Sequence, residues 1–441
     1  MASTLQTSCR LVITDLPMKT DSVSHSRHEL ALTDRVGMTW AGDDAEVSMA
    51  FEESSGVRPT ILHFIYGVGG GGAEAMMRSL LRGLDCRRWR VVLVAMQAKA
   101  WPEESEELRR TVDAFHVLEE TSLLSKSALG KLRDLMRIEN PDVVQTWMHH
   151  ADFTGGLVAR MAGIKRVVWG IHCREITRAP GESKIKAWLF AQMMPLMSYW
   201  LPSCVVSCSQ VALEDHLKIG YAKEKLTWIP NGVDTQRFKP EQSVRKKMRE
   251  QMGLNEDVFL IGFVGRFHEM KHLPLLLRAF GLLSARQSGV CLILCGVKRE
   301  DLDEECEMVV QSLPKAARIL WLPFQSNPER FYPGLDVFTL SSRTEACPMT
   351  ILEAMACGVT CVTTDVGDCG RLIGETGTVV PAGDEEALAF AWGELFGMSR
   401  QERQEMGVAC RARVVEMFSL ERAADRYSAL YEDLIQRGAT K

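Results

Sequence analysis

Short apolar runs alternate with amphipathic segments of helical period along most of the chain. Each apolar run is bounded by turn-forming residues, which is typical of a buried strand. The gaps between runs carry a helical spacing of apolar positions, which predicts helices at 73–84, 125–139, 271–285 and 388–396. The predicted strands are 61–66, 91–96, 114–118, 143–146, 166–171, 204–209, 226–229, 260–264, 291–295, 319–322, 337–340, 359–364 and 378–380. This alternation predicts an α/β fold with parallel sheets and crossover helices.

The turn-rich segment 229–234 interrupts the alternation and divides it into two series. A chain of 441 residues is also longer than one ordinary core. We therefore expect two doubly wound, Rossmann-like domains at 58–235 and 236–418, which face each other across a cleft. Ligands in such folds bind at the C-terminal ends of the strands. Residues 1–57 are polar and are expected to form a poorly ordered extension. The last segment, 419–441, is expected to be a helix that packs back towards the first domain.

Composition narrows the class of protein further. The 13 cysteines include no CxxC pair, which favours a reducing compartment over a disulfide framework or a zinc site. The apolar segment 187–209 contains Pro195 and Pro202 and predicts a helix followed by a strand, not a membrane-spanning helix.

The net charge is −5, but 58–235 is mildly basic. Its basic residues predict either solvated helix faces or attraction to an anionic membrane or a phosphorylated acceptor. They include Arg87, Arg88, Arg90, Arg109, Arg110, Lys126, Lys131, Arg133 and Arg137. Nucleic acid is a poor fit, because aromatic residues do not interleave with these charges.

A glycine-rich turn follows the first predicted strand, and Gly70, Gly71 and Gly72 lie where the next helix begins. The glycines at 67, 69 and 72 satisfy the GxGxxG pattern of dinucleotide-binding folds. That pattern also requires an acid at the end of the second strand, where this chain has Gln97 and Lys99. The turn therefore disfavours NAD, and it has no Walker lysine. What remains is a turn at which a phosphate or a sugar can approach the backbone.

Two glutamates, Glu345 and Glu353, stand eight positions apart after the predicted strand 337–340. Pro348 suits the first position of a helix and Gly358 the residue after its end. The start of this helix, at Pro348, Met349 and Thr350, would then present free N–H groups of Met349 and Thr350 that favour an anion such as phosphate. The two carboxylates can accept hydrogen bonds from a sugar and a ribose. Alternatively, they are one capping acid and one solvated helix acid.

Two cations, Arg266 and Lys271, follow the predicted strand 260–264. Because they lie past the C-terminal end of that strand, they are placed to neutralise a diphosphate. A basic loop without a ligand remains the alternative interpretation.

These features occur together in a recognisable order. The motifs are Gly-Gly-Ala-Glu at 71–74, Ile-Pro-Asn-Gly-Val-Asp at 229–234 with Phe238, Gly265-Arg266 with Lys271, and Glu345 with Glu353. Together they resemble the retaining glycosyltransferases of family 4 (group 1), which have the GT-B fold and use nucleotide sugars. The resemblance covers roughly 58–435. The stretches 146–152 and 167–172 resemble those of bacterial capsule, exopolysaccharide or lipopolysaccharide enzymes.

The resemblance implies roles for single residues. Glu353 would bind the donor ribose and Glu345 the transferred sugar, while Arg266 and Lys271 would clamp the diphosphate. His172 matches a cleft histidine of the family that contacts the donor sugar, and the turn at Gly70–Gly72 would close over the phosphates and the acceptor.

Other positions are less specific. His149 and His150 follow a strand, and either could touch an acceptor. Asp152 is either an acceptor-orienting base or a helix N-cap. His63, His116 and His216 fall in core or helix patterns. Two departures from the family pattern are Ala346-Cys347 after the first glutamate, which puts the identity of the sugar in question, and Pro323, where a glycine is common.

The chemistry that the resemblance implies is sugar transfer to an acceptor hydroxyl with retention. The leaving phosphate takes the acceptor's proton, so no nucleophilic carboxylate is expected. No cluster of acids resembles a divalent-metal site, so the reaction is expected to need no metal and no cofactor. The expected partners are a nucleotide sugar, a saccharide or lipid-linked saccharide acceptor and an anionic membrane surface, with the enzyme in the cytoplasm or at the inner face of the membrane. Domain closure is expected near 230–234. The alternatives are a non-catalytic or regulatory nucleotide-sugar-binding protein, a nucleotide-sugar epimerase of the same fold, and a metal hydrolase. The donor sugar, the acceptor and the oligomeric state are left open.

Overall fold

The structure is a computed structural model that describes residues 57–176, 183–325 and 327–439. The polar extension predicted for residues 1–57 lies outside the described residues except for Val57. The first α/β series runs from Thr60 to Trp228. It consists of β1 (Thr60–Gly67), α1 (Gly72–Gly83), β2 (Arg90–Gln97), α2 (Pro102–Thr111), β3 (Ala114–Val117), α3 (Lys126–Glu139), β4 (Val143–Thr146), α4 (His149–Met161), β5 (Val167–Ile171), α5 (Lys184–Ser198), β6 (Cys204–Ser207), α6 (Gln210–Lys218), η1 (Lys223–Lys225) and β7 (Leu226–Trp228).

The second series runs from Gln242 to Met417 and is followed by one long helix. It consists of α7 (Gln242–Gln251), β8 (Phe259–Val264), η2 (Glu269–Lys271), α8 (Leu273–Arg286), β9 (Val290–Cys295), η3 (Arg299–Asp301), α9 (Glu304–Ser312), β10 (Arg318–Leu322), η4 (Pro328–Arg330), η5 (Tyr332–Gly334), β11 (Val337–Leu340), α10 (Met349–Ala356), β12 (Cys361–Thr364), α11 (Cys369–Ile373), β13 (Thr378–Val380), α12 (Glu385–Gly397) and α13 (Arg400–Met417), with α14 (Leu420–Ala439) last.

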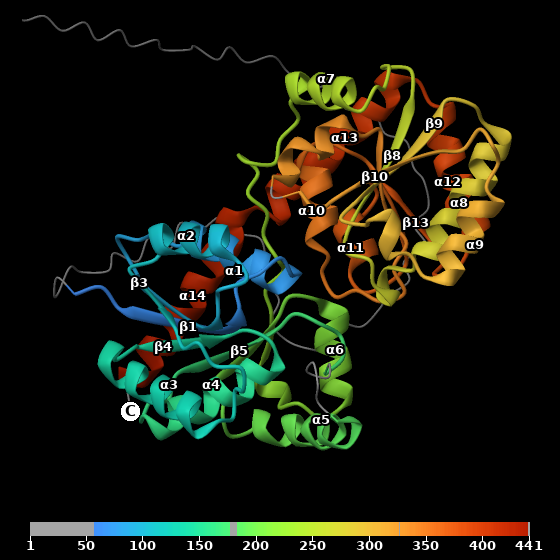
Figure 1. Cartoon of the computed structure of the whole chain (residues 1–441). Coiled ribbons are helices and arrows are strands. Elements are labelled where there is room, and N and C mark those ends of the chain that lie inside the picture. The colour runs from blue at the N-terminus through green and yellow to red at the C-terminus, as the bar shows by residue number, and fades with distance from the viewer. Residues whose placement is uncertain (1–56, 177–182, 326, 440–441) are drawn as a thin grey trace, which may run out of the picture. The chain divides into compact units, whose positions relative to one another are not determined.

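The strands form two fully parallel sheets, and each predicted strand is present (Figure 1). The first sheet has seven strands in the order β3-β2-β1-β4-β5-β6-β7, and the second has six in the order β10-β9-β8-β11-β12-β13. In both sheets the strand order reverses beside the first strand, which is the point where doubly wound sheets bind ligands. The predicted fold class is therefore confirmed.

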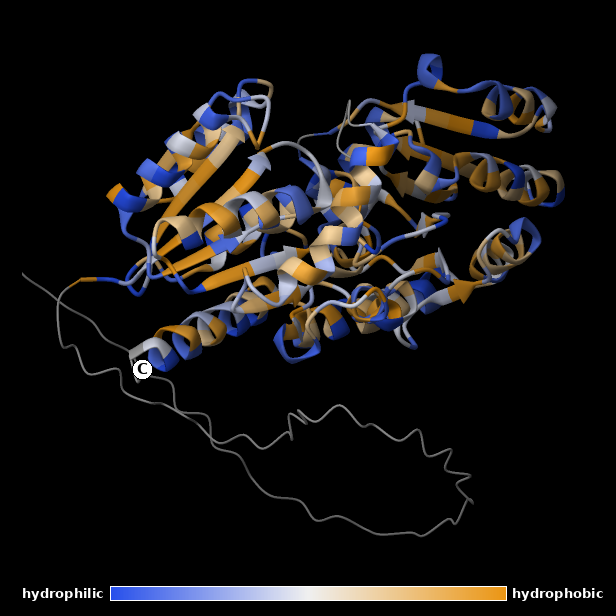
Figure 2. Ribbon diagram, turned by 90° about the horizontal axis from the view of Figure 1, so that it is seen from below, coloured by the Kyte–Doolittle hydropathy of each residue, from blue (hydrophilic) through white to orange (hydrophobic). Residues whose placement is uncertain are grey.

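The sheets are buried on both sides, so their strands read as nearly continuous apolar runs. Figure 2 shows this hydrophobic colouring along the strands and its alternation along the helices. In β2, for example, the residues from Val91 to Met96 are all buried. Serine side chains cap several helices; Ser125, Ser183 and Ser209 each accept a hydrogen bond from a backbone N–H of the first turn.

The chain passes twice between the two α/β series, and the two passages lie side by side. Val233, in the segment after β7, donates its N–H to the Phe418 carbonyl at 2.9 Å, and its own carbonyl accepts from the Leu420 N–H at 2.9 Å. After this second passage α14 packs on the first series, where the Tyr431 hydroxyl donates to Gln145 at 3.4 Å (Figure 1). The last helix therefore packs on the first series.

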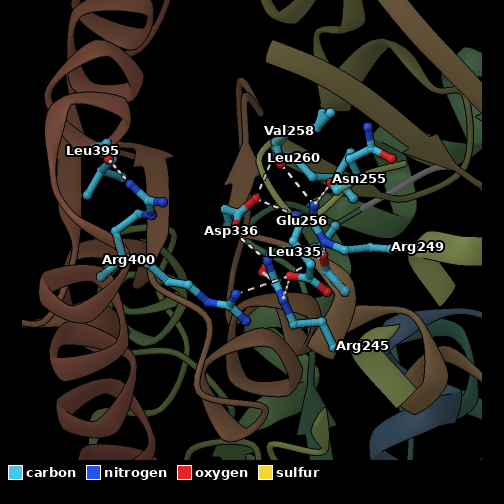
Figure 3. A network of polar contacts seen from close by, with 12 residues as sticks. Arg245, Arg249, Asn255, Glu256, Val258, Leu260, Leu335, Asp336, Leu395 and Arg400 are labelled. Carbon is cyan, nitrogen blue, oxygen red and sulfur yellow. Dashed lines mark hydrogen bonds and ion pairs between the residues drawn. The ribbon is translucent and has the colours of Figure 1, made fainter. Parts of the chain in front are cut away.

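A buried network of charges fixes the start of β11 (Figure 3). Asp336 accepts hydrogen bonds from Arg245, from Arg249 and from the Leu260 N–H. The Arg249 side chain is 2% exposed, and its guanidinium also donates to three backbone carbonyls. Because both arginines come from α7, the network ties this helix to the two central strands of the second sheet.

The predicted basic surface of the first series is largely neutralised by neighbouring acids. Six of its nine members form ion pairs, namely Arg87, Arg88, Arg90, Arg110, Lys131 and Arg133. This arrangement favours the solvated-face interpretation. The apolar segment 187–209 divides into the end of α5, a connection and β6. Within the described ranges, every helix is too short or too polar to cross a membrane.

Candidate functional site

The central feature is an ion pair between the loops that follow β8 and β11. The Lys271 ammonium donates to Glu345 Oε1 at 2.6 Å, and the Ser342 hydroxyl donates to the same oxygen at 2.6 Å. Both charged side chains are mostly buried, with 25% of Lys271 and 12% of Glu345 exposed. Arg266, two residues past the end of β8, is exposed. The structure therefore brings together two of the predicted site residues and leaves Arg266 open to solvent nearby in the chain.

Backbone contacts hold these two loops in register. Ser341 donates its hydroxyl to the Lys271 carbonyl at 2.8 Å, and the Arg343 N–H donates to the Met270 carbonyl at 2.8 Å. Gly367, which has a φ of 54°, lies so close to Glu345 that an added Cβ would stand 2.1 Å from the Glu345 carbonyl oxygen. Only glycine fits there, because both the φ and the spacing exclude a side chain.

The Ala346-Cys347 step is held from two directions. The Asp368 N–H donates to the Ala346 carbonyl at 2.9 Å, and the Asn231 amide donates to the Cys347 carbonyl at 2.9 Å. Asn231 belongs to the turn-rich segment between the two series, so this segment supports the site directly. Both Ala346 and Cys347 are buried, with 7% of each exposed.

Helix α10 begins one residue later than predicted. Pro348 is its N-cap and Met349 its first residue, and Gly358 follows the C-cap with a φ of 70°. Pro348 has no side chain that can accept from the free N–H groups of the first turn. The Thr350 hydroxyl is buried and has no hydrogen-bond partner among the described residues. This helix start therefore has polar groups available for a ligand.

Glu353 lies on α10 and is held by a residue that the sequence did not indicate. The Tyr332 hydroxyl donates to Glu353 Oε2 at 2.6 Å, and Tyr332 is fully buried. Burial raises the pKa of Glu353, while the Tyr332 hydrogen bond and the positive charge of Arg237 lower it. Tyr332 lies in a short 3₁₀ helix that has no apolar periodicity, so no sequence pattern pointed to this contact.

The glycine turn after β1 is crowded on one side and open on the other. A Cβ at Gly69 would stand 2.3 Å from the Trp101 ring, and one at Gly71 would stand 2.1 Å from Glu74 Oε2. Gly72, by contrast, has no atom within 4 Å of such a position. The turn residues are not at positive φ, so close approach and not backbone conformation explains these glycines. Trp101 was missed because it follows β2, outside the motif.

Contacts from the second series reach this turn. The Phe324 ring, which is 61% exposed, lies 3.6 Å from the position of a Cβ on Gly70. Burial raises the pKa of Glu74, and the positive charges of Arg78 and Arg266 oppose that rise. Arg266 therefore acts electrostatically on the turn that the sequence assigned to the same site.

His172 follows β5 and stacks on the Trp147 ring, with centroids 4.9 Å apart. Neither of its ring nitrogens has a hydrogen-bond partner among the described residues. Burial lowers the pKa of His172 to about 4, so the ring is neutral near pH 7 and can exchange a hydrogen bond with a hydroxyl. Met148, the residue after Trp147, has the unusual φ of 72°. Such backbone strain is often found near functional groups.

The structure corrects the interpretation of Asp152 as a helix N-cap. Helix α4 has Met148 as its N-cap, and Asp152 lies inside the first turn and is fully buried. Asp152 Oδ1 accepts from the Thr146 hydroxyl at 2.6 Å and from the Gly170 N–H at 3.1 Å. Burial raises the pKa of Asp152 well above its usual range. Its contacts join the ends of β4 and β5, and its 0% exposure leaves it no surface towards solvent.

Three other histidines contact aromatic or histidine side chains. His150 stacks on Phe190 of α5 with centroids 4.4 Å apart. His63 is fully buried and accepts from the Trp147 indole, and His216 is hydrogen-bonded to His149 at 2.8 Å. Within the described parts of the chain no group of three or more His, Cys, Asp and Glu residues is placed to hold a metal ion. Metal independence stays a prediction.

Solved structures with the same arrangement identify the fold. HepE of Anabaena, solved in complex with UDP-glucose, superposes with a TM-score of 0.71 at 18% identity, over 85% of this chain and 99% of HepE. WaaG, a glycosyltransferase involved in lipopolysaccharide biosynthesis, superposes with a TM-score of 0.63 at 15% identity, over 83% and 98%. The two doubly wound sheets, with charged groups at their strand ends, therefore define a protein of the GT-B class.

Family-level similarity gives a more specific assignment. The family described as "Glycosyltransferase Family 4" matches residues 70–237, and "Glycosyl transferases group 1" matches residues 258–397. The two matches cover one α/β series each. The chain belongs to the family 4, group 1 glycosyltransferases, as the sequence motifs predicted.

Curated relatives agree with this assignment. An α-1,3-galactosyltransferase of Escherichia coli that acts on GlcNAc-diphosphoundecaprenol is 23% identical, over 70% of this chain and 79% of the relative. The lipopolysaccharide core mannosyltransferase LpsB of Rhizobium meliloti is 30% identical, over 48% and 61%. The donor sugars of these two relatives differ, so similarity alone leaves the donor of this chain undetermined.

Proposed function

We propose that the chain transfers a sugar from a nucleoside-diphosphate sugar to an acceptor hydroxyl, with retention at the anomeric carbon. The observation that carries this proposal is the cluster of Lys271, Glu345 and the open start of α10, with Glu353 further along the same helix. Cations and free N–H groups suit a diphosphate, and the two carboxylates suit hydroxyl-rich groups.

In this proposal Lys271 and Arg266 clamp the diphosphate. Without a ligand the Lys271 ammonium is neutralised by Glu345 at 2.6 Å. A diphosphate that reaches Lys271 draws the ammonium towards its own oxygens, and the Glu345 carboxylate is then available for the hydroxyls of the sugar. The negative charge grows on the diphosphate as it departs, so fixed cations lower the barrier more than they strengthen ground-state binding.

Glu353 binds the ribose hydroxyls in this proposal, and Tyr332 fixes the orientation of its carboxylate. The neutral ring of His172 contacts the donor sugar, and His150 lies on the acceptor side. Asp152 contributes by joining Thr146 to Gly170, and not by contacting substrate. The backbone of Gly70, Gly71 and Gly72 approaches the phosphates and the acceptor, which the open space beside Gly72 permits.

Retention needs no nucleophilic side chain if the leaving phosphate accepts the proton of the acceptor hydroxyl on the same face. The bond from the anomeric carbon to the phosphate oxygen breaks, the bond to the acceptor oxygen forms, and the acceptor proton moves to the diphosphate. The chain's work is then positioning and charge stabilisation, without a metal or a cofactor. We further propose a cytoplasmic enzyme at the inner membrane face, whose acceptor is a saccharide or a lipid-linked saccharide, because the named relatives act in such pathways.

The test is a comparison of two lysine variants after a thermal-shift panel of nucleotide sugars has identified a donor. Lys271→Ala is expected to lower kcat/KM by about a hundredfold or more, as expected for loss of a group that stabilises transition-state charge. Lys246→Ala, on the exposed face of α7, is the matched control and should leave activity unchanged.

Full activity of Lys271→Ala or of Arg266→Ala contradicts the proposal. Product formation without acceptor indicates an epimerase, and binding without turnover indicates a regulatory protein. Activity that is lost with a chelator and restored by a divalent cation refutes metal independence.

A further inference from the structure

Helix α5 exposes a large apolar face to solvent. Ile185, Trp188 and Leu189 are 73%, 61% and 54% exposed, and Leu196 is 63% exposed. Their positions recur at helical spacing, so they lie along one stripe of the helix. On the opposite side Met194, Pro195 and Ser198 are buried. One side of the helix thus packs on the protein, while aromatic and aliphatic side chains on the other side are exposed to solvent.

Two further aromatic residues extend this stripe beyond the helix. Tyr199 and Trp200 follow α5 directly and are 51% and 74% exposed. We call the exposed side chains of Ile185, Trp188, Leu189, Leu196, Tyr199 and Trp200 the α5 face. Exposed apolar residues that stand singly need no explanation, but six in one stripe mark an interaction surface.

The charges around the α5 face are mostly positive. Lys184 and Lys186 stand exposed in its first turn, and the helix contains no acid. At the other end the Lys225 ammonium donates to the Ser198 and Tyr199 carbonyls, so η1 lies against the end of α5. In the same 3₁₀ helix Lys223 and Glu224 are both exposed, so its lysines outnumber its one acid. The face thus combines a tryptophan-bearing apolar stripe with lysines at both ends.

This combination fits an anionic lipid surface. Tryptophan and tyrosine favour the boundary between headgroups and acyl chains, and lysines attract anionic headgroups. A helix of 15 residues is about 22 Å long, which is too short to span a bilayer but long enough to lie in its interface. A second copy of the chain is a poorer occupant, because a symmetric contact through this face would bring the lysines of both copies together.

We propose that the α5 face inserts into the headgroup region of an anionic membrane and holds the protein there. The inference does not depend on the proposed reaction. It places membrane attachment on α5, and not on the mostly ion-paired basic residues of the first series.

Sedimentation of the full-length protein with lipid vesicles tests this assignment. Vesicles of phosphatidylcholine with about one-third phosphatidylglycerol should bind the protein, and pure phosphatidylcholine vesicles should bind it at least tenfold more weakly. Trp188→Glu with Trp200→Glu is expected to lower the partition coefficient at least tenfold. Lys184→Gln with Lys186→Gln is expected to lower it about tenfold or more, with a reduced salt dependence.

Matched controls lie on the second α/β series. Phe390→Glu removes an aromatic side chain that is 66% exposed on α12, and Lys246→Gln with Lys247→Gln removes two exposed lysines of α7. Both controls should bind vesicles as the unmodified protein does. Equal unfolding temperatures and equal thermal shifts with UDP show that the variants are folded and keep the nucleotide site.

Three results would overturn the proposal. The first is absence of vesicle binding by the unmodified protein, and the second is unchanged binding by the tryptophan variant. The third is a concentration-dependent dimer that the same substitution abolishes, which would assign the α5 face to a second copy. Loss of glycosyl transfer in the Lys271→Ala variant with intact vesicle binding would leave this proposal standing, so the two proposals fail separately.

Discussion

The hydroxyl of Tyr332 provides a test of how Glu353 is held. Tyr332→Phe removes one oxygen atom and leaves the ring, which is fully buried, in place. The lost contact is the 2.6 Å hydrogen bond to Glu353 Oε2. Because the acceptor carries a charge when ionised, the bond is expected to contribute about 1.5–3 kcal/mol, more than a bond between neutral groups.

The size of the loss should depend on pH, and its sign follows from the pKa of Glu353. Burial raises that pKa, so the folded protein binds this proton more tightly than the unfolded chain. The contribution of Glu353 to the free energy of unfolding therefore falls as pH rises through the interval above about 4.5. The Tyr332 hydrogen bond opposes the pKa shift. Its removal costs most where Glu353 is ionised and least where the carboxyl is protonated.

Two measurements follow from this reasoning. Urea-induced unfolding of Tyr332→Phe, compared with the unmodified protein, should show a larger loss of stability at pH 7.5 than at pH 4.5. Titration calorimetry with UDP should show affinity weakened by about tenfold at neutral pH, equivalent to about 1.4 kcal/mol, because the ribose contact is no longer oriented. Tyr66→Phe is the matched control, since the Tyr66 hydroxyl donates to the Thr121 carbonyl at an exposed site.

Two outcomes would refute the argument. Equal stability of Tyr332→Phe and the unmodified protein at pH 7.5 would show that the hydrogen bond contributes nothing measurable. A clear loss of stability with unchanged UDP affinity would show that Tyr332 supports the fold but does not position Glu353 for a ligand.

Two further predictions concern the stability of each α/β series. Arg249→Met leaves Asp336 with one arginine partner and takes one donor from each of three backbone carbonyls, so it should lower the free energy of unfolding by about 3–5 kcal/mol. Lys246→Met should change it by less than about 0.5 kcal/mol, and urea unfolding measures both. Because burial lowers the pKa of His172 to about 4, the unfolded chain binds its proton first as the solution is acidified, and stability should fall as pH drops from about 6.5 to 4, by about 3 kcal/mol at most for this residue. His172→Gln should flatten that part of the pH profile, and an unchanged profile would contradict the assigned pKa.

The fold and the order of the site loops were open to prediction because they depend on local sequence. Buried parallel strands give apolar runs, and the loops that carry Arg266 and Glu345 follow two of those runs directly. Once the strands are placed, the C-terminal ends of β8 and β11 are adjacent, since these strands pair in the sheet. The sequence therefore indicated which loops meet, although not which side chains in them form contacts.

The contacts that the sequence did not indicate join residues far apart in the chain. Lys271 and Glu345 were assigned to different groups of the ligand, and nothing in their spacing suggests that they pair with each other. Asp368 accepts from the N–H groups of Gln210 and Val211 at the start of α6, although it lies 158 residues after Gln210. Asp152 was misassigned for a related reason, because an acid near a helix start resembles a cap unless its burial is known.

The paired passages at Val233 and Ser419 determine how this enzyme can be recombined with its relatives. A chimaera that takes everything after residue 235 from another enzyme would also exchange α14. The residue in place of Tyr431 would then come from a different parent than Gln145, its hydrogen-bond partner in the retained half. An exchange of the second α/β series alone therefore needs two junctions, one at each passage. Shuffling experiments on donor choice should therefore transplant an internal segment of roughly 236–418, and keep both ends of the chain from one parent.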